Sequence, residues 1–525
     1  MNESDIAWGP KKINGNVWER KWKIPSLITR NFFEYWNKNS MELLSQGFSV
    51  KKTKGEWYVI QTGEVNTDTV KNSTLPSVKV EPLKDTSGLR PWQVPVVENL
   101  CAIIKNQGAA IDGSDLGCGK SYVACAVARE LNLNILIVCP KAVRESWNRI
   151  INKHFDLKDS LIGIINYEML RTGKTESKIA SYVRRRDTRR KEFIWKLPVK
   201  STLIIWDECQ KLKNPKTKNS ETCLAALDQG YKMLFCSATV ATNPLELYTV
   251  GRSLKMFNTK PAYYKWLYEH GVSKGRFGFE FNGSLSVLKK LHKDVFVDRG
   301  VRLSRDTIPN FPESQIIAEC YNMESETEKK INEVYAEMKL ELNRLKSKIK
   351  SEKGDSTSEL TAILRDRQKI ELLKIPLFLE MIEDGLENNM SVAVFVNFTE
   401  TLNAIAERLN TTCIINGEAK NEKNRQQNID DFQSDKKRVI LINIAAGGAG
   451  VSLHDITGKH ARLSLISPSY SAVLMRQATG RVWRDNAKSK SIQKIVFVSN
   501  TVEEKVCESV NKKLINLDML NDGDL

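Results

Sequence analysis

The sequence has no long apolar run and no paired cysteines. No stretch of about 18 consecutive apolar residues occurs, so no membrane-spanning helix is predicted. The ten cysteines and five histidines are scattered singly, which predicts neither a zinc site nor a disulfide framework. The first residues, MNESDIAWGPKK, lack the apolar core of a secretory signal. These absences exclude membrane spans, zinc fingers and disulfide scaffolds, and they favour a reducing compartment.

Positive charge, by contrast, is abundant. The 525 residues are enough for two to four domains with real cores. Hydrophobic residues make up 41% of the chain and charged residues 27%, as in ordinary globular proteins. Lysine and arginine number 80 against 63 aspartates and glutamates, which gives a formal net charge of +17. This balance favours a polyanionic partner, usually nucleic acid.

The stretch LIIWDECQKLKN, residues 203–214, organises the chain. Its apolar run ends in two adjacent carboxylates, Asp207 and Glu208. A buried strand that carries acids at its C-terminal end suits a parallel sheet, where ligands bind just past the strand ends. In phosphate-loop ATPases the first acid holds Mg²⁺ and a nearby polar group positions the attacking water. An isolated acid pair would more often be a charged turn, so the interpretation depends on two other motifs.

The first of these motifs is a phosphate loop. A short apolar strand over 109–113 precedes SDLGCGKS, residues 114–121, and a helical pattern follows. Backbone N–H groups and the start of that helix would face an anion. We expect Lys120 to contact the β- and γ-phosphates and the Ser121 hydroxyl to bind Mg²⁺. The strict pattern has glycine at position 114, where this chain has Ser114, but the replacement removes no backbone donor.

A glutamine lies just upstream of the loop. LRPWQ, residues 89–93, opens a predicted helix that runs to about Lys105, and Pro91 is well placed early in a helix. The side-chain amide of Gln93 can both donate and accept a hydrogen bond. Those two functions are what recognition of an adenine edge requires, so Gln93 is a candidate adenine contact.

The second motif is an arginine pair far downstream. QATGRVWR, residues 477–484, is predicted to open a helix, on which Arg481 and Arg484 would share a face. Arginines that enter an ATP site from a second domain stabilise the charge that builds on the transferred phosphoryl. Because the first half of the chain supplies everything but such a group, the pair is predicted to complete an ATP site.

The order of the elements predicts an α/β protein with two strand-helix alternations. Residues 1–61 are predicted to form a small α+β module, with a helix over 26–44 and a hairpin over 48–61, and 62–88 a linker. The first alternation ends near residue 250, and 251–310 is predicted to hold helices and loops. The other predicted elements are a strand over 315–321, a helical hairpin over about 324–380, strands over 391–396, 411–417, 438–444 and 463–466, and a tail over 516–525.

Several polar residues after predicted strands are candidates for nucleic-acid contact. They are Lys141, Ser237, Thr239, Asn397 and Thr399. The densest charge run, RRRDTRRK over 184–191, adds Arg184, Arg185 and Arg186. That run fits equally well a solvated helix face or a ridge that contacts phosphates.

Together these segments resemble superfamily 2 helicases and, within them, the Swi/Snf-type DNA translocases, over about residues 89–515. LRPWQ resembles the glutamine motif of the family, DECQKLKN its DEAH-x-LKN box, and RQATGRVWR its motif VI. Gln210 stands where most relatives have histidine, SATVATNPLEL departs from the usual motif III, and motif VI is closer to general superfamily 2 helicases. We identify no module in the first 60 residues from their sequence.

The resemblance implies two RecA-like lobes, 89–310 and 311–515, with ATP and Mg²⁺ between them. Lys120, Asp207, Glu208, Arg481 and Arg484 would be catalytic, with Ser121 and Asp207 on the metal. The residues that would hold the nucleotide are Arg90, Gln93, Asp115, Gly117, Cys118, Gly119, Lys120, Ser121, Gly448, Gly450 and Gln477.

The implied activity is ATP-driven translocation along double-stranded DNA. A strand-separating DNA helicase for recombination intermediates and an RNA helicase or RNA-polymerase-remodelling ATPase stay open, and a scaffold without ATPase activity is disfavoured by the complete set of site residues. We expect a DNA partner, no zinc, no membrane, and room for a protein partner on residues 1–61. The cytoplasm of a bacterial or phage-infected cell is expected rather than a nucleus.

Overall fold

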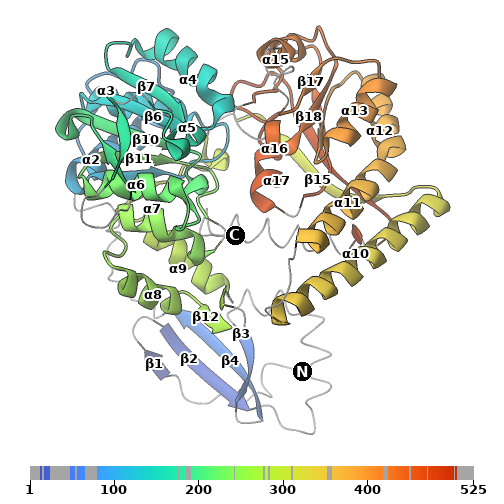
Figure 1. Ribbon diagram of the computed structural model, residues 1–525, viewed down its shortest axis with the longest axis horizontal. Coiled ribbons are helices and arrows are strands. Elements are labelled where there is room, and N and C mark those ends of the chain that lie inside the picture. Colours follow the sequence, from blue (N-terminus) through green and yellow to red (C-terminus); the bar gives the residue numbers. More distant parts are fainter. Residues whose placement is uncertain are drawn as a thin grey trace. The chain divides into compact units, whose positions relative to one another are not determined.

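The computed structural model divides into two compact units, Met1–Thr74 and Leu75–Leu525 (Figure 1). The first unit is a four-stranded antiparallel sheet with the order β1-β2-β4-β3. The structure describes residues 12–14, 17–23, 48–53, 56–64, 80–175, 178–184, 191–241, 243–275, 278–281, 284–308, 311–351, 357–417, 424–447, 451–469, 471–501 and 503–504.

The strands of the first unit are β1 (Lys12–Asn14), β2 (Val17–Lys23), β3 (Phe48–Thr53) and β4 (Glu56–Glu64). The hairpin predicted over 48–61 is confirmed as β3 and β4. The linker predicted from residue 62 was wrong at its start, because the last three residues of β4 pair with β2, a strand that we did not predict. The helix predicted over 26–44 lies outside the described residues.

The second unit contains a six-stranded parallel sheet with the order β14-β5-β11-β10-β6-β7. The predicted organising strand is β10 (Thr202–Asp207), and Leu203 to Trp206 are fully buried. Ile204 and Trp206 pack in one hydrophobic core and Leu203 and Ile205 in another, because alternate residues of a strand point to opposite faces. The other strands are β5 (Ala109–Asp112), β6 (Asn134–Cys139), β7 (Leu161–Asn166), β11 (Lys232–Cys236) and β14 (Gly300–Val301).

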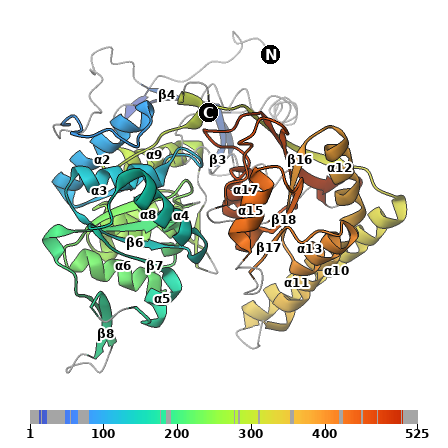
Figure 2. The same ribbon diagram turned by 90° about the horizontal axis from the view of Figure 1, so that it is seen from above.

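Helices accompany this sheet, and we call the assembly of residues 80–308 the first lobe. The strand-helix alternation confirms the predicted α/β class (Figures 1 and 2). The α-helices are α2 (Val94–Gln107), α3 (Lys120–Glu130), α4 (Arg144–Ile150), α5 (Tyr167–Thr172), α6 (Lys218–Asp228), α7 (Tyr248–Ser253), α8 (Lys260–Glu269) and α9 (Leu285–Phe296), and the short helix η3 (Pro91–Gln93) precedes α2.

The prediction of helices and loops alone over 251–310 was wrong, because three strands occur there. β12 (Val272–Gly275) and β13 (Gly278–Phe281) form a hairpin, and β14 extends the sheet beside β5. A Cβ on Gly300 would lie 2.5 Å from the carbonyl oxygen of Ile111, so only glycine permits this approach. A strand of two residues has no periodicity by which sequence could reveal it.

A second six-stranded parallel sheet, with the order β15-β20-β19-β16-β18-β17, forms the core of what we call the second lobe, residues 311–504. Strand β17 covers only two of the seven residues predicted over 411–417, and β20 was not predicted. The strands are β15 (Ser314–Tyr321), β16 (Ser391–Val396), β17 (Ile414–Ile415), β18 (Val439–Asn443), β19 (Arg462–Ile466) and β20 (Ser491–Val498).

The predicted helical hairpin is present as α10 (Ser325–Ser351) and α11 (Thr357–Leu373), which pack together. Its predicted end at 380 was wrong, because the chain turns at buried Lys374, whose ammonium lies 2.9 Å from Glu503. A new helix, α12 (Ile375–Glu387), then starts with a proline in its first turn. The remaining helices are α13 (Thr399–Arg408), α15 (Arg425–Gln433), α16 (Ile444–Gly447) and α17 (Ala472–Thr479).

Among the described helices, none is both long and apolar enough to span a bilayer. The lobe boundary predicted at residue 310 stays a prediction, although the strands of the two parallel sheets fall on either side of it.

Candidate active site

A pocket of about 520 Å³ lies where loops of the two lobes meet. This volume is typical of a small-molecule site, for which roughly 300–1,000 Å³ is usual. The first lobe contributes the loop between β5 and α3 and the end of β10, and the second contributes two segments of its chain. The lining includes Arg90, Gln93, Gly117, Cys118, Gly119, Lys120, Ser121, Trp147, Asp207, Glu208, Ser452, His454, Arg481 and Arg484.

The phosphate loop turns into α3 through two glycines with left-handed backbone, Gly117 (φ 88°) and Gly119 (φ 80°). The ammonium of Lys120 donates hydrogen bonds to the carbonyl oxygens of Ser114 (2.7 Å) and Asp115 (2.9 Å). Carbonyl oxygens are weaker partners for an ammonium than phosphate oxygens are. We therefore expect Lys120 to leave these carbonyls when a nucleotide binds.

The side chain of Gln93 is hydrogen-bonded to this loop. Its buried amide nitrogen donates to the carbonyl oxygen of Cys118 (2.9 Å), and its amide oxygen accepts from the backbone N–H of Arg90 (2.8 Å). A Cβ on Gly119 would lie 2.3 Å from that nitrogen, so the contact requires glycine. The amide retains one donor and one lone pair. The adenine contact stays a prediction, and Gln93 also has a structural role that the sequence did not indicate.

The first acid, Asp207, is fixed at the end of β10. Its Oδ2 accepts from the indole N–H of Trp147 (2.9 Å) and its Oδ1 from the backbone N–H of Glu208 (3.0 Å). Burial, and then the neighbouring Glu208 carboxylate, raise the pKa of Asp207 above its usual range. A half-buried carboxylate in this state gains from a bound cation. Each oxygen keeps a lone pair, so Asp207 could hold Mg²⁺, and Ser121 would supply a hydroxyl ligand. A bound Mg²⁺ would neutralise phosphate charge.

The second acid, Glu208, has a left-handed backbone (φ 53°) and joins a chain of side chains. Its Oε2 accepts from the amide nitrogens of Gln210 (2.6 Å) and Gln477 (3.1 Å). The Ser237 hydroxyl donates to the amide oxygen of Gln210 (2.7 Å), and the backbone N–H of Thr239 donates to Ser237 (3.0 Å). Gln210, in place of the usual histidine, therefore links Ser237 and Glu208. Nucleic-acid contact by Ser237 and Thr239 stays a prediction.

The arginine pair reaches the pocket from a loop and not from a helix. The prediction that Arg481 and Arg484 share a helix face was wrong, because α17 ends at Thr479. The next residue, Gly480, packs so closely on the first lobe that a Cβ would lie 2.6 Å from a methyl carbon of Leu116. In a continuing helix the positions of the two side chains would be set by the helical repeat. In the loop, both guanidiniums instead lie near the same backbone carbonyl.

That carbonyl belongs to Val451. The Nη1 atom of Arg481 and the Nη2 atom of Arg484 lie 3.5 and 3.3 Å from it. Burial lowers the pKa of Arg481 to about 10 and that of Arg484 to about 9. Both remain cations at neutral pH, and Arg484 Nε has no hydrogen-bond partner among the described residues. Buried guanidiniums beside a phosphate loop fit a polyanion such as ATP.

Sequence reasoning missed a cluster of three arginines around Asp115. Its Oδ1 lies 2.9 Å from Arg302 Nη2 and 3.2 Å from Arg476 Nη2, and its Oδ2 lies 3.5 Å from Arg305 Nε. Burial raises the pKa of Asp115, but Arg302, Arg305 and Arg476 outweigh it and hold the pKa well below its usual range. Arg476 comes from α17, so the phosphate loop and the second lobe share an ion pair.

Replacing Asp115 by asparagine should destabilise the chain by about 3–5 kcal/mol, because it leaves buried guanidiniums without their anion. The measurement is denaturant unfolding. The matched control is Asp228→Asn, which breaks an exposed pair with Arg252 (3.0 Å, aspartate 58% exposed) and should cost less than about 1 kcal/mol. Equal losses in the two variants would show that the arginine cluster adds nothing to stability.

His454 lines the pocket beside the arginines, and sequence gave it no role. Burial, and then Arg484 and Arg462, lower the pKa of its imidazole to about 4. In the unfolded chain the imidazole takes up a proton below its ordinary pKa of about 6.5. The unfolded state therefore binds more protons between about pH 6.5 and 4, and stability is lost as the pH falls through that range.

We expect His454→Gln to remove this component of the pH dependence. The loss of unfolding free energy between pH 7 and 5 should shrink by about 2 kcal/mol relative to wild type. Chemical denaturation at the two pH values measures it, with His154→Gln as the control that removes an exposed imidazole from the same pocket. An unchanged difference in His454→Gln would mean that the imidazole titrates alike in both states.

Other predicted residues have different surroundings. The Asn397 amide donates to Glu371 (2.8 Å), Ser467 (3.3 Å) and the carbonyl of Pro468 (3.1 Å). Its N–H groups are therefore hydrogen-bonded within the second lobe. Thr399 is the first residue of α13, and exposed Lys141 follows β6. DNA contact by these residues stays a prediction.

Part of the remaining set falls outside the described residues, namely Gly448, Gly450, Arg185 and Arg186. Arg184 ends β8 (Ala180–Arg184), and its register partner Lys191 begins β9 (Lys191–Trp195). A helix face was therefore wrong for both ends of the charge run. Figure 2 shows β8 projecting from the first lobe.

Comparison with known proteins gives two adjoining matches. The SNF2-related domain matches residues 21–373, and the helicase conserved C-terminal domain matches residues 373–486. Together the two matches contain every residue that lines the pocket.

This chain is also similar to individual proteins. A protein of Acanthamoeba polyphaga mimivirus, provisionally named an ATP-dependent RNA helicase, is 32% identical over 83% of this chain and 84% of its own length. The SWI/SNF-related matrix-associated actin-dependent regulator of chromatin subfamily A-like protein 1 of Drosophila melanogaster is 24% identical over 83% of this chain and 56% of its own length. The solved SWI2/SNF2 ATPase core of Sulfolobus solfataricus with double-stranded DNA is 19% identical, with a TM-score of 0.34, over 85% of this chain and 96% of its own.

Proposed function

We propose that this chain, which belongs to the SNF2-related family, is an ATPase that couples hydrolysis to movement along double-stranded DNA. ATP hydrolysis itself follows from membership of this family of helicase-like ATPases, as the sequence predicted. Translocation, the duplex substrate and the use of Mg²⁺ are the proposed part. The remodelling of protein-bound or branched DNA is the work that such movement would perform.

The observation that carries the proposal is the pocket shared by the two lobes. Lys120, Asp207 and Glu208 come from the first lobe, and Arg481 and Arg484 from the second. Hydrolysis in such a site depends on how the lobes meet, since an arginine supplied from the second lobe stabilises the transferred phosphoryl. DNA bound across both lobes would favour that contact, and repeated binding and release of ATP would then move the lobes along a strand.

Charge and family support a DNA partner. The net charge of +17 suits a polyanion, and the relative from Drosophila melanogaster is named a regulator of chromatin. The trailing Lys213-Asn214 after the acid pair is the part of DECQKLKN that resembles the DNA translocases.

The test is ATP hydrolysis alone, with double-stranded DNA, with single-stranded DNA and with RNA, with Glu208→Gln as the blank. Stimulation by duplex DNA, together with displacement of a third strand from a triplex, would support the proposal. Stimulation by single strands or RNA alone would overturn it.

A second candidate function is an RNA helicase, favoured by the name of the mimivirus relative. In the same assay it predicts stimulation by RNA above that by duplex DNA, and separation of a forked RNA duplex. A strand-separating DNA helicase would instead unwind a forked DNA duplex. These outcomes distinguish the three activities because each requires a different stimulating nucleic acid or product.

The charge run at the β8–β9 pair offers a test of the DNA path. Reversing Arg184, Arg185 and Arg186 to glutamate should weaken duplex binding and reduce the slope of log affinity against log salt by up to about 2.7, or about 0.9 for each lost phosphate contact. The measurement is a salt titration of DNA binding. The matched control reverses exposed Lys329, Lys330 and Lys339 on α10. A slope equal to that of wild type would mean that the charge run is a solvated surface that makes no phosphate contacts.

A further inference from the structure

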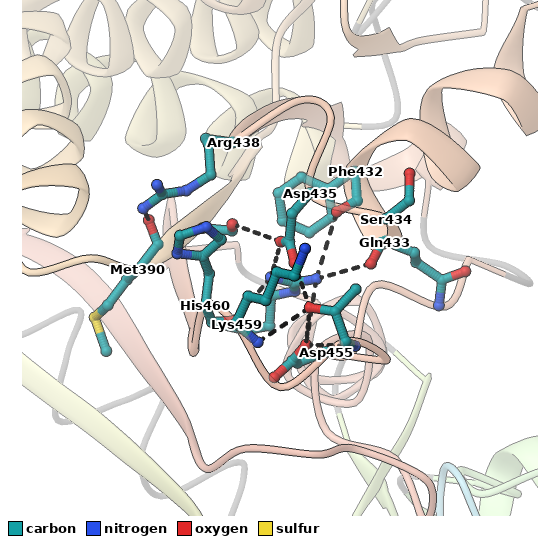
Figure 3. A network of polar contacts seen from close by, with 12 residues as sticks. Met390, Phe432, Gln433, Ser434, Asp435, Arg438, Asp455, Lys459 and His460 are labelled. Carbon is teal, nitrogen blue, oxygen red and sulfur yellow. Dashed lines mark hydrogen bonds and ion pairs between the residues drawn. The ribbon is translucent and has the colours of Figure 1, made fainter.

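A network of polar contacts in the second lobe joins Asp435, Asp455 and the residues at the end of α15 (Figure 3). The group that they share is the guanidinium of Arg462, at the start of β19, whose residue is 1% exposed. A cation buried this completely costs several kcal/mol unless it is paired and fully hydrogen-bonded. An arginine is not needed to form the strand or to fill the hydrophobic core. We therefore looked for a specific role of Arg462 in the contacts of its guanidinium.

Every N–H of this guanidinium has an acceptor. Nε donates to the carbonyl of Leu453 (3.2 Å), and Nη1 donates to Asp435 Oδ1 (2.6 Å) and to the carbonyl of His460 (2.8 Å). Nη2 donates to the carbonyls of Phe432 (3.4 Å) and Gln433 (3.2 Å). An arginine has five N–H donors in a rigid planar fork, so this set of acceptors fixes its orientation completely.

The acceptors belong to three parts of the chain. Phe432 and Gln433 are the last two residues of α15, where a cation is favourable. Asp435 follows that helix and also accepts from the hydroxyl of Ser391 (3.0 Å) on β16. Leu453 lies in the segment Val451–Asp455, which has no regular secondary structure. Arg462 thus ties an irregular segment to a helix end and to the sheet.

The segment Val451–Asp455 alternates between the core and the pocket. Val451, Leu453 and Asp455 are fully buried, whereas Ser452 and His454 line the pocket. Such alternation is that of an extended chain, in which successive side chains point to opposite sides. Asp455 is anchored by the backbone N–H groups of Thr457 and Gly458 (both 2.9 Å) and lies 3.8 Å from Arg462 Nη2.

Both pocket arginines are bound to this segment. The backbone N–H of Leu453 donates to the carbonyl of Arg481 (2.9 Å). The carbonyl of Val451 lies 3.5 Å from Arg481 Nη1 and 3.3 Å from Arg484 Nη2. Leu453 is therefore held by Arg462 at its carbonyl oxygen, and its N–H donates to the backbone of Arg481.

We propose that Arg462 is a positioning residue for ATP hydrolysis, which fixes segment Val451–Asp455 and through it the guanidiniums of Arg481 and Arg484. The inference rests on the proposed function, because it assigns those two guanidiniums to the transferred phosphoryl. Arg462 does not touch the pocket. A displacement of about 1 Å in a catalytic group can cost on the order of 100-fold in rate, so a group that only sets position can have a large effect.

The test uses the full chain and duplex-stimulated ATP hydrolysis. Arg462→Lys keeps the charge beside Asp435 but cannot serve five acceptors. We expect kcat to fall by about tenfold or more, with the Kd of a fluorescent ATP analogue within about twofold of wild type. Arg438→Lys is the matched control, since Arg438 donates to the carbonyl of Met390 (2.6 Å) in the same lobe, and its kcat should be unchanged.

A second variant avoids the core. Exposed Thr457 has its hydroxyl 3.1 Å from Asp455 Oδ1, and the same hydroxyl also bonds Asp435. Thr457→Val should also lower kcat, by a smaller factor than Arg462→Lys. If Arg462→Lys does not fold, kcat of Thr457→Val tests the inference. In an Arg481→Ala background, Arg462→Lys should lower kcat by a smaller factor than in the wild type, because the part of its effect that passes through Arg481 is already lost.

The inference is overturned if kcat in Arg462→Lys and Thr457→Val equals that of wild type. It is equally overturned if Arg462→Lys lowers kcat by the same factor with and without Arg481, since that result marks a general structural loss. A wild-type chain that does not hydrolyse ATP would overturn the proposed function and this inference with it. An active wild type with unaffected variants overturns this inference alone.

Discussion

Glu208→Gln is expected to bind ATP like the wild type and to hydrolyse it about 10²–10⁴-fold more slowly, the range of a lost general base. Glutamine has the shape of glutamate, and the amide donors of Gln210 and Gln477 now bond Glu208 Oε2. The variant loses the negative charge that would orient the attacking water or take its proton. Steady-state hydrolysis with duplex DNA gives kcat, and a fluorescent ATP analogue gives the affinity.

Two comparisons make this result specific. Lys120→Ala should abolish hydrolysis by weakening nucleotide binding itself, because it removes the ammonium that would contact the phosphates. Glu326→Gln changes an exposed glutamate of α10 that lies 2.7 Å from Lys330, outside the pocket, and should hydrolyse ATP like the wild type. Near wild-type turnover in Glu208→Gln would mean that another group serves as the base.

Arg481→Ala is expected to lower duplex-stimulated kcat by about 10³–10⁵-fold, the contribution of an arginine supplied to a transferred phosphoryl. The residue is 2% exposed, and Glu208 is among the charges that act on its guanidinium. Since the guanidinium comes from the second lobe, its loss should affect kcat far more than nucleotide affinity. Single-turnover hydrolysis separates the chemical step from product release.

The control for this variant is Arg344→Ala, which removes an exposed arginine of α10 that pairs with Glu341 (2.6 Å). Its kcat should match that of wild type. Arg484→Ala should resemble Arg481→Ala, because both guanidiniums bond the same Val451 carbonyl. A fall in kcat of less than tenfold in both variants would mean that the arginine pair does not stabilise the transition state.

The sequence predicted the parts of the site that are local in the chain. An apolar run that ends in Asp207 and Glu208 and a glycine turn before Lys120 are each complete within about a dozen residues. Hydrophobic alternation cannot be seen in a fully buried strand, but length and flanking polar residues sufficed for β10. Strand β14, by contrast, has two residues and owes its place to pairing with β5.

The charge pairs could not be predicted in the same way. Asp115 meets Arg302 and Arg476, which lie 187 and 361 residues away in the chain. Nothing in the neighbourhood of these arginines distinguishes them from surface residues. The end of α17 was missed for a similar reason, because the close packing of Gly480 on Leu116 comes from a distant segment. Tertiary contact overrode local helix propensity there.

The shared ion pair of Asp115 also has a consequence for how such chains diverge. The phosphate loop carries a carboxylate whose buried partners sit at positions 302, 305 and 476. A descendant that neutralised position 115 would carry unmatched cations, and one that lost those cations would carry an unmatched anion. Change at these sites is therefore tolerated mainly in concert. The two lobes, although each has its own sheet, are therefore expected to evolve together. A hybrid that joins lobes from distant relatives would need the carboxylate and its three arginines to come from a single parent.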